Sequence, residues 1–175
     1  MKKFYTLALI IASATLIPGQ TKFTRTQSNS GGVPAQCTGE GLSVKRVSDD
    51  AGLGNRAVNY AFTNTSTSPC VLNGYPGFVL LDRAGRPLRR AHIIKGEGTY
   101  FLQAEPTQTV TLQPGGTAWF QIAFYACPGR GSCPVSAKVR ITAPGTKRAF
   151  VLNERIEPSA GKVHVTPVRS GLPQQ

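Results

Sequence analysis

Residues 63–81 constrain the fold of this chain more than any other segment. They read T-N-T-S-T-S-P-C-V-L-N-G-Y-P-G-F-V-L-L, with a cysteine, two prolines and two glycines among apolar runs. Short hydroxyl and amide side chains compete for local backbone groups, and Pro69 removes a backbone donor, so the chain turns here. Apolar residues return at 70–72 and 78–81, which predicts two short strands separated by a reversal at Asn73 and Gly74.

The rest of the chain shows the period-two alternation of half-buried strands. Val58, Tyr60 and Phe62 share one face of a predicted strand, and residues 117–125 place aromatic side chains on both faces of another. Residues 49–55 are predicted to form a turn-rich loop. The chain has 19 glycines and 13 prolines and shows no long helical pattern, so we expect many short strands joined by turns, that is, an all-β chain. The expected strands are residues 42–47, 56–63, 70–72, 78–81, 87–94, 107–112, 117–125, 135–141, 148–152 and 162–168. This spacing predicts a Greek-key β-sandwich of about eight to ten strands.

A resemblance to a known family rests on three motifs. The string N-T-S-x-x-P-C-x-L-x-G-Y-P-G occupies residues 64–77, L-L-D-x-x-G follows at 80–85, and L-x-P-G-G-T-A occupies 112–118. Together they resemble a secreted bacterial family known as domain of unknown function 4232, over roughly residues 37–168. The resemblance implies an exported immunoglobulin-like sandwich and implies no reaction.

The amino terminus has the pattern of a secretory signal. Lys2 and Lys3 precede an apolar segment at 4–17, which Pro18 and Gly19 interrupt before it is long enough to span a membrane. We therefore predict a signal peptide at 1–20, with an uncleaved anchor as the alternative. Residues 21–36 are predicted to be a flexible tether, 37–168 a single domain and 169–175 a loose tail. The expected location is periplasmic, cell-surface or extracellular.

Four cysteines in an exported chain predict two disulfides. Cys127 and Cys133 flank a compact Gly/Pro loop that brings its ends together, so we pair them. Cys37 is then left to pair with Cys70. A zinc site is the alternative, but the spacing is not C-x-x-C, and we expect neither a metal nor a cofactor.

Basic residues dominate the charge. The chain carries +12, and removing residues 1–20 leaves +10, which favours anionic polymers, acidic lipid surfaces or acidic proteins as partners. The alternative is that the charge only maintains solubility. The candidate ligand-binding residues fall within thirteen positions and face only Asp82 as an opposing charge: Arg83, Arg86, Arg89, Arg90 and Lys95. On one face they would bind phosphate, sulfate or carboxylate; otherwise they protect an edge strand from pairing.

Catalytic patterns are weak, and we expect that the protein is not an enzyme. The two histidines, His92 and His164, lie in predicted strands as solvent-facing residues, no G-x-S-x-G elbow occurs, and the eight acids are scattered. The basic run lacks the interleaved aromatic residues of single-stranded nucleic-acid sites. The sequence carries no signal for a particular oligomeric state. It predicts an exported binding domain, or alternatively a structural or accessory envelope protein that acts through protein contacts.

Overall fold

The computed structural model describes residues 32, 34–129 and 132–174. The predicted signal peptide at 1–20 and the predicted tether as far as residue 31 lie outside these residues. The described fold belongs to the compact unit Val33–Gln175. Within the described part of the chain, no helix is both long and apolar enough to cross a membrane.

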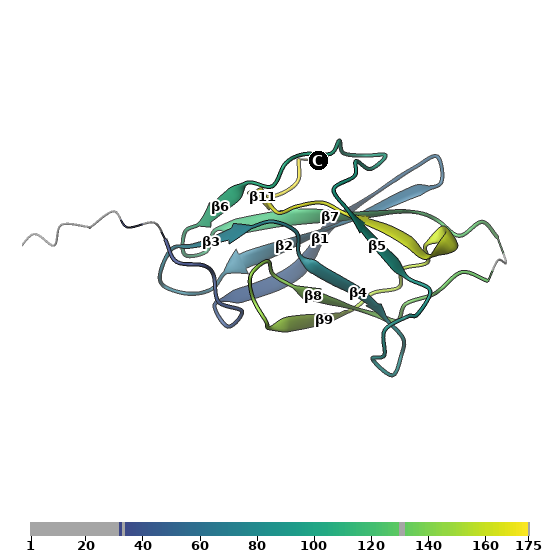
Figure 1. Ribbon diagram of the computed structural model, residues 1–175, viewed down its shortest axis with the longest axis horizontal. Coiled ribbons are helices and arrows are strands. Elements are labelled where there is room, and N and C mark those ends of the chain that lie inside the picture. The colour runs from purple at the N-terminus through teal and green to yellow at the C-terminus, as the bar shows by residue number, and fades with distance from the viewer. Residues whose placement is uncertain (1–31, 33, 130–131, 175) are drawn as a thin grey trace, which may run out of the picture. The chain divides into compact units, whose positions relative to one another are not determined.

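The described residues form strands and one short 3-10 turn, arranged in three sheets (Figure 1). The largest sheet has the order β1-β2-β7-β10-β5, and β11 also pairs with β7. A three-stranded sheet has the order β4-β8-β9, and β3 pairs with β6. The elements are β1 (Leu42–Gly52), β2 (Asn55–Asn64), β3 (Cys70–Asn73), β4 (Gly77–Leu81), β5 (His92–Lys95), β6 (Thr109–Leu112), β7 (Thr117–Tyr125), β8 (Lys138–Thr142), β9 (Ala149–Asn153), η1 (Ser159–Gly161), β10 (Lys162–Val165) and β11 (Arg169–Ser170). The predicted all-β, sandwich-like class is confirmed, with eleven strands in the described residues.

A single apolar core joins the large sheet to the two smaller ones. The Tyr60 ring of β2 lies 5.5 Å from Phe120 of β7 and 6.1 Å from Phe78 of β4, measured between ring centroids. Burial of such aliphatic and aromatic side chains is the main favourable term in folding. The other large, fully buried side chains are Phe62, Leu72, Leu80, Leu112, Ile122, Val139, Ile141, Ile156, Val163 and Val165.

The hairpin between β1 and β2 is longer than the sequence indicates. Residues 49–55 were expected to be a loop, but β1 continues to Gly52 and pairs with β2 up to that residue, with one register shift between Arg46 and Ser48. Leu53 and Gly54 make the turn with φ of +48° and +84°, the left-handed pair that suits a two-residue hairpin. The acidic side chains at 49 and 50 are exposed, so their polarity does not interrupt the strand.

The corner at 63–81 is held by a buried asparagine and a disulfide. The Asn64 amide donates to the carbonyls of Ser68 at 2.9 Å and Leu112 at 3.0 Å, and its oxygen accepts from the Ser66 N–H. Cys70 then opens β3 and is bonded to Cys37. Cys127 and Cys133 form the second disulfide, so both pairs are those expected from the sequence.

The ordered unit extends beyond both expected limits. The Val71 N–H donates to the Ala35 carbonyl at 2.9 Å, and the Gln36 amide donates to the Pro144 carbonyl at 3.0 Å, so the fold begins before Cys37. The tail from Arg169 was expected to be loose. Instead Arg169 and Ser170 form β11 against β7, because the Arg169 side chain covers a buried tryptophan of that strand.

Candidate functional site

Two of the predicted arginines lie in a tight turn that follows β4. Asp82 accepts from the Arg86 N–H and from Arg86 Nε, each at 2.9 Å, and Gly85 takes a φ of +81° to close the turn. The Arg86 N–H, followed by the guanidinium, lowers the pKa of Asp82. This carboxylate therefore fixes Arg86, whereas Arg83 has no ion pair or hydrogen-bonding partner among the described residues.

A groove of about 670 Å³ separates this turn from a distant segment of the chain. Arg83 and Arg86 line it with Asp82, and Arg155 lines it from the other side. Ser136 places Arg155 there, because its buried hydroxyl donates to the Glu154 carbonyl and accepts from the Ile156 N–H, each at 2.8 Å. The backbone of Glu154 and Ile156 is thereby fixed, and the side chain of Arg155 between them lines the groove. Three arginines and one aspartate thus line the groove, and the Arg155 guanidinium is paired with Glu157.

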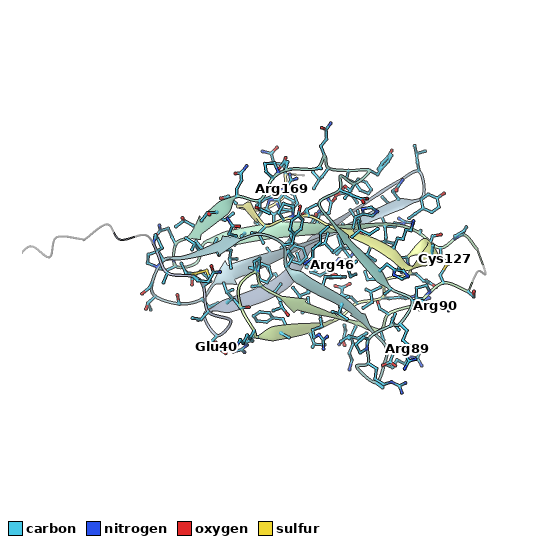
Figure 2. All side chains as sticks on the ribbon, in the orientation of Figure 1. Glu40, Arg46, Arg89, Arg90, Cys127 and Arg169 are labelled. Atoms are coloured by element: carbon cyan, nitrogen blue, oxygen red, sulfur yellow. A yellow bond between two sulfur atoms is a disulfide. The ribbon has the colours of Figure 1, made fainter. Side chains whose placement is uncertain are left out.

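The other predicted residues lie outside this groove. Arg89 and Arg90 are exposed in the turn before β5, on the connection labelled in Figure 2, and are not part of the groove lining. Lys95 lies at the opposite end of β5, with its ammonium 5.9 Å from the centre of the Tyr75 ring. The five residues therefore do not line one groove together, which was the condition for a shared anion site. The predicted strand at 87–94 is also shorter, because a turn from Leu88 to Ala91 delays β5 until His92.

The edge-strand alternative is met only in part. β5 does lie at the edge of the large sheet, paired in parallel with β10 alone. Of the five basic residues, however, only Lys95 belongs to it. The four arginines precede the strand, so protection of its edge does not account for them.

A second pocket, of about 380 Å³, is also rich in arginine but is balanced in charge. Arg46 contacts Asp49 at 3.0 Å and Glu154 at 3.2 Å. Burial raises the pKa of Glu154, against the lowering effect of Arg46. The charged residues lining this pocket are Arg46, Arg56 and Arg155 with Asp49, Asp50 and Glu157. Equal numbers of each sign make it a weaker anion site than the groove at Arg83.

The outer face of the large sheet, which points away from the core, is covered by residues 96–108, here called the strap. The strap connects β5 to β6 along the upper side of Figure 1. Thr99 donates to the Gln121 side chain at 3.2 Å, and Glu105 contacts Arg169 at 3.2 Å. Arg169 in turn lies 5.5 Å above the Trp119 ring. Polar contacts therefore hold this cover in place.

The two histidines lie in different surroundings. His92 is exposed, as expected. His164 is not fully solvent-facing: its side chain is 27 % exposed, and its Nδ1 is buried 3.7 Å from a Glu97 carboxylate oxygen of the strap. Across residues 32, 34–129 and 132–174, no three His, Cys, Asp or Glu side chains gather in a way that could hold a metal ion.

Sequence reasoning missed one arginine of the groove. Arg155 is about seventy positions from Arg83 and stands next to acidic residues, so local charge density gives no signal for it. Its contribution depends on the hydroxyl clamp of Ser136, which only the folded chain reveals.

Comparisons with known proteins agree with the sequence motifs. Searches of curated proteins and of solved structures each returned no match. A family model, described as domain of unknown function (DUF4232), matches residues 37–169, which is most of the chain. The matched segment includes the corner at 63–81, both disulfides and all strands from β1 to β10. The chain therefore belongs to the DUF4232 family.

Proposed function

We propose that this protein is an exported, non-catalytic binding domain that holds anionic groups of an envelope or extracellular ligand in the groove between Arg83, Arg86 and Arg155. The presence of three arginines from two distant segments in the lining of one groove supports the proposal. Guanidinium groups bind phosphate, sulfate and carboxylate through paired, charge-assisted hydrogen bonds. Two disulfides support an oxidising location outside the cytoplasm.

The three arginines have different parts in this proposal. Asp82 accepts a hydrogen bond from Arg86 Nε and so fixes the orientation of this guanidinium, whose other N–H groups would donate to the ligand. Arg155 is paired with Glu157 at 2.8 Å, at a position that is largely exposed to solvent. Arg83 is exposed and keeps its full donor capacity. A ligand anion would thus meet one unpaired guanidinium and two that are already oriented.

The test uses the oxidised full chain and three soluble probes: polyphosphate, dextran sulfate and polyglutamate. We expect one class to bind in a salt-dependent manner, because displaced counterions and screening weaken such contacts. Replacing Arg83 and Arg155 by glutamine removes two guanidinium groups and should weaken binding by roughly a hundredfold or more, because each hydrogen bond to a charged group contributes about 1.5–3 kcal/mol. Glutamine keeps much of the side-chain length and avoids repulsion from Glu157.

The matched control replaces Lys45 and Lys147 by glutamine. Both lysines are exposed and outside the groove, so this variant has the same net charge as the arginine variant. Equal weakening in the two double variants would mean that only overall charge matters, and the groove would not be a site. If none of the three probes binds, the alternative of a structural or accessory protein acting through protein contacts takes precedence.

A further inference from the structure

A further hollow, distinct from the arginine groove and from the pocket at Arg46, lies between the strap and the outer face of the large sheet. Its volume is about 340 Å³, within the range of small-molecule pockets of roughly 300–1,000 Å³. It shares no lining residue with the arginine groove. The residues that define its chemistry are Asn55, Thr99, Tyr100, Tyr125, Lys162 and His164.

The strand register explains why a hollow forms here. Tyr125 pairs with Asn55 across β7 and β2, and His164 pairs with Ala123 across β10 and β7. Directly paired residues point to the same face, so these side chains share the outer face of the sheet. Ala123 has only a methyl group and leaves space among its larger neighbours. The strap closes one side of that space with Thr99 and Tyr100.

Two tyrosine rings flank the hollow and remain half exposed. Tyr100 is 55 % exposed and Tyr125 is 52 % exposed. With Leu53 of the adjacent hairpin they make up three of the six large exposed hydrophobic side chains in the described residues. Isolated exposed apolar residues are ordinary, whereas a gathered set rimmed by polar groups marks a binding surface.

Glycines in the β1–β2 hairpin support both rings. A Cβ on Gly52 would lie 3.0 Å from the Tyr100 ring, and a Cβ on Gly54 would lie 2.7 Å from the Tyr125 ring. Each ring therefore lies close to backbone without a Cβ, and a side chain at Gly54 would require the Tyr125 ring to shift. The hairpin fixes the two aromatic surfaces without covering them.

The backbone beside the hollow is strained in two places. Leu53 and Ala160 are the non-glycine residues with positive φ in the described part of the chain, at +48° and +51°. Ala160 lines the hollow, and Leu53 lies between the two supporting glycines. Left-handed backbone at a side chain with Cβ costs energy and is concentrated at ligand sites. Among the described residues, one of the two strained positions therefore lines the hollow, and the other lies in the hairpin turn beside Gly52 and Gly54.

We propose that this hollow binds a sugar ring of a glycan. A pyranose has an apolar C–H face and polar hydroxyl edges, and an aromatic ring offers a negative face to such C–H groups. The two tyrosines supply the aromatic surfaces. The amide of Asn55 and the ammonium of Lys162 supply the hydrogen-bonding partners for hydroxyl groups. An extended proline-rich peptide also docks on aromatic side chains, but its apolar rings would leave this polar lining unpaired.

The test uses uncharged oligosaccharides, so that it is independent of the arginine groove. The full chain, oxidised and labelled with ¹⁵N, is titrated with cellotetraose, maltotetraose and chitotetraose. We expect one of them to shift the amide signals of residues 55, 98–100, 123–125 and 159–164. The Arg83→Gln, Arg155→Gln double variant should bind the same sugar unchanged, so either proposal can fail without the other.

Substitutions then separate stacking from general effects on the fold. Tyr100→Ala and Tyr125→Ala should each weaken sugar binding by roughly tenfold, whereas Tyr125→Phe keeps the ring and should retain most of the affinity. Tyr75→Ala, on a ring that does not line the hollow, should leave affinity unchanged. Thermal unfolding of each variant checks that it is folded. Binding of none of the three sugars at this surface, or equal binding by the folded Tyr125→Ala protein, would overturn the proposal, as would shifts at these residues with a decaproline peptide alone.

Discussion

The two faces of the six-stranded sheet are both buried, but by different means. On the inner face, aromatic and aliphatic side chains of β2, β7 and β10 pack against the two smaller sheets. On the outer face, Asn59 and Gln121 are 2 % and 3 % exposed, and a loop covers them. The Gln121 amide donates to Asn59 at 3.1 Å and its oxygen accepts from Thr99 of the strap.

This difference implies that the inner face provides most of the stability and that the outer face is the easier one to open. Apolar burial is non-directional and contributes in proportion to area, so the inner face holds the domain together. A hydrogen-bonded cover contributes little net energy while its bonds are made, but leaves costly unpaired groups when one partner is lost. Regions with few apolar contacts open locally before the core does. The outer face, which carries the aromatic hollow, should therefore be the more mobile of the two.

The largest expected effect is a cavity in the inner face. Phe120 is fully buried and its ring lies 5.5 Å from both Tyr60 and Phe62. Phe120→Ala should lower the free energy of unfolding by about 3–5 kcal/mol, measured by urea denaturation of the oxidised protein. The matched outer-face change, Tyr125→Ala, removes a half-exposed ring of the same strand and should cost about 1 kcal/mol or less. Similar losses in the two variants would contradict the distinction between the faces.

An intermediate effect is expected when the polar layer of the outer face is broken. Gln121→Ala leaves the buried Asn59 oxygen and the Thr99 hydroxyl without their partner, at a cost of about 1–3 kcal/mol. Amide hydrogen exchange in the strap should accelerate more than exchange in β4 or β8. Asn73→Ala is the control, since it removes a 2.8 Å side-chain bond to Thr109 that is exposed. A strap whose exchange rate does not change in Gln121→Ala would show that the polar contacts do not hold it.

The smallest effect concerns the one hydroxyl of the inner aromatic cluster. The Tyr60 hydroxyl is buried without a hydrogen-bonding partner, and burial raises its pKa. Tyr60→Phe should therefore be neutral or stabilise the fold by up to about 1 kcal/mol in thermal unfolding. Thr99→Val removes a hydroxyl that is satisfied on the outer side, and should instead destabilise. A loss of stability in Tyr60→Phe as large as that in Thr99→Val would be the opposite result.

The inner face was open to prediction from sequence because its pattern is local. Alternation at 117–125 predicted β7 with its observed limits, and the cysteine spacing predicted both disulfides. β5 was placed too early because its limits depend on pairing with β10, far along the chain. The extension of β1 to Gly52 likewise depends on its hairpin partner, which stabilises polar residues that otherwise indicate a loop.

The candidate sites were less accessible to sequence analysis for the same reason. Arg83 and Arg86 stand in one charged run, so their proximity is visible in the sequence. Arg155 joins them only through Ser136, and Tyr100 meets Tyr125 only across a hairpin that neither belongs to. Grouping of this kind is a property of the three-dimensional fold, and no periodicity in the chain encodes it.

The position of β10 bears on the order in which the molecule can be assembled. This strand lies between β7 and β5 in the sheet, yet β1 to β9 all precede it along the chain. His92 precedes its paired residue Lys162 by some seventy positions. Contacts between such distant positions form slowly because a long loop must close first. Until residues 162–170 have been synthesised, one side of β7 and the whole of β5 have no neighbouring strand. The large sheet therefore closes only after β10 has been added to strands that were made long before it.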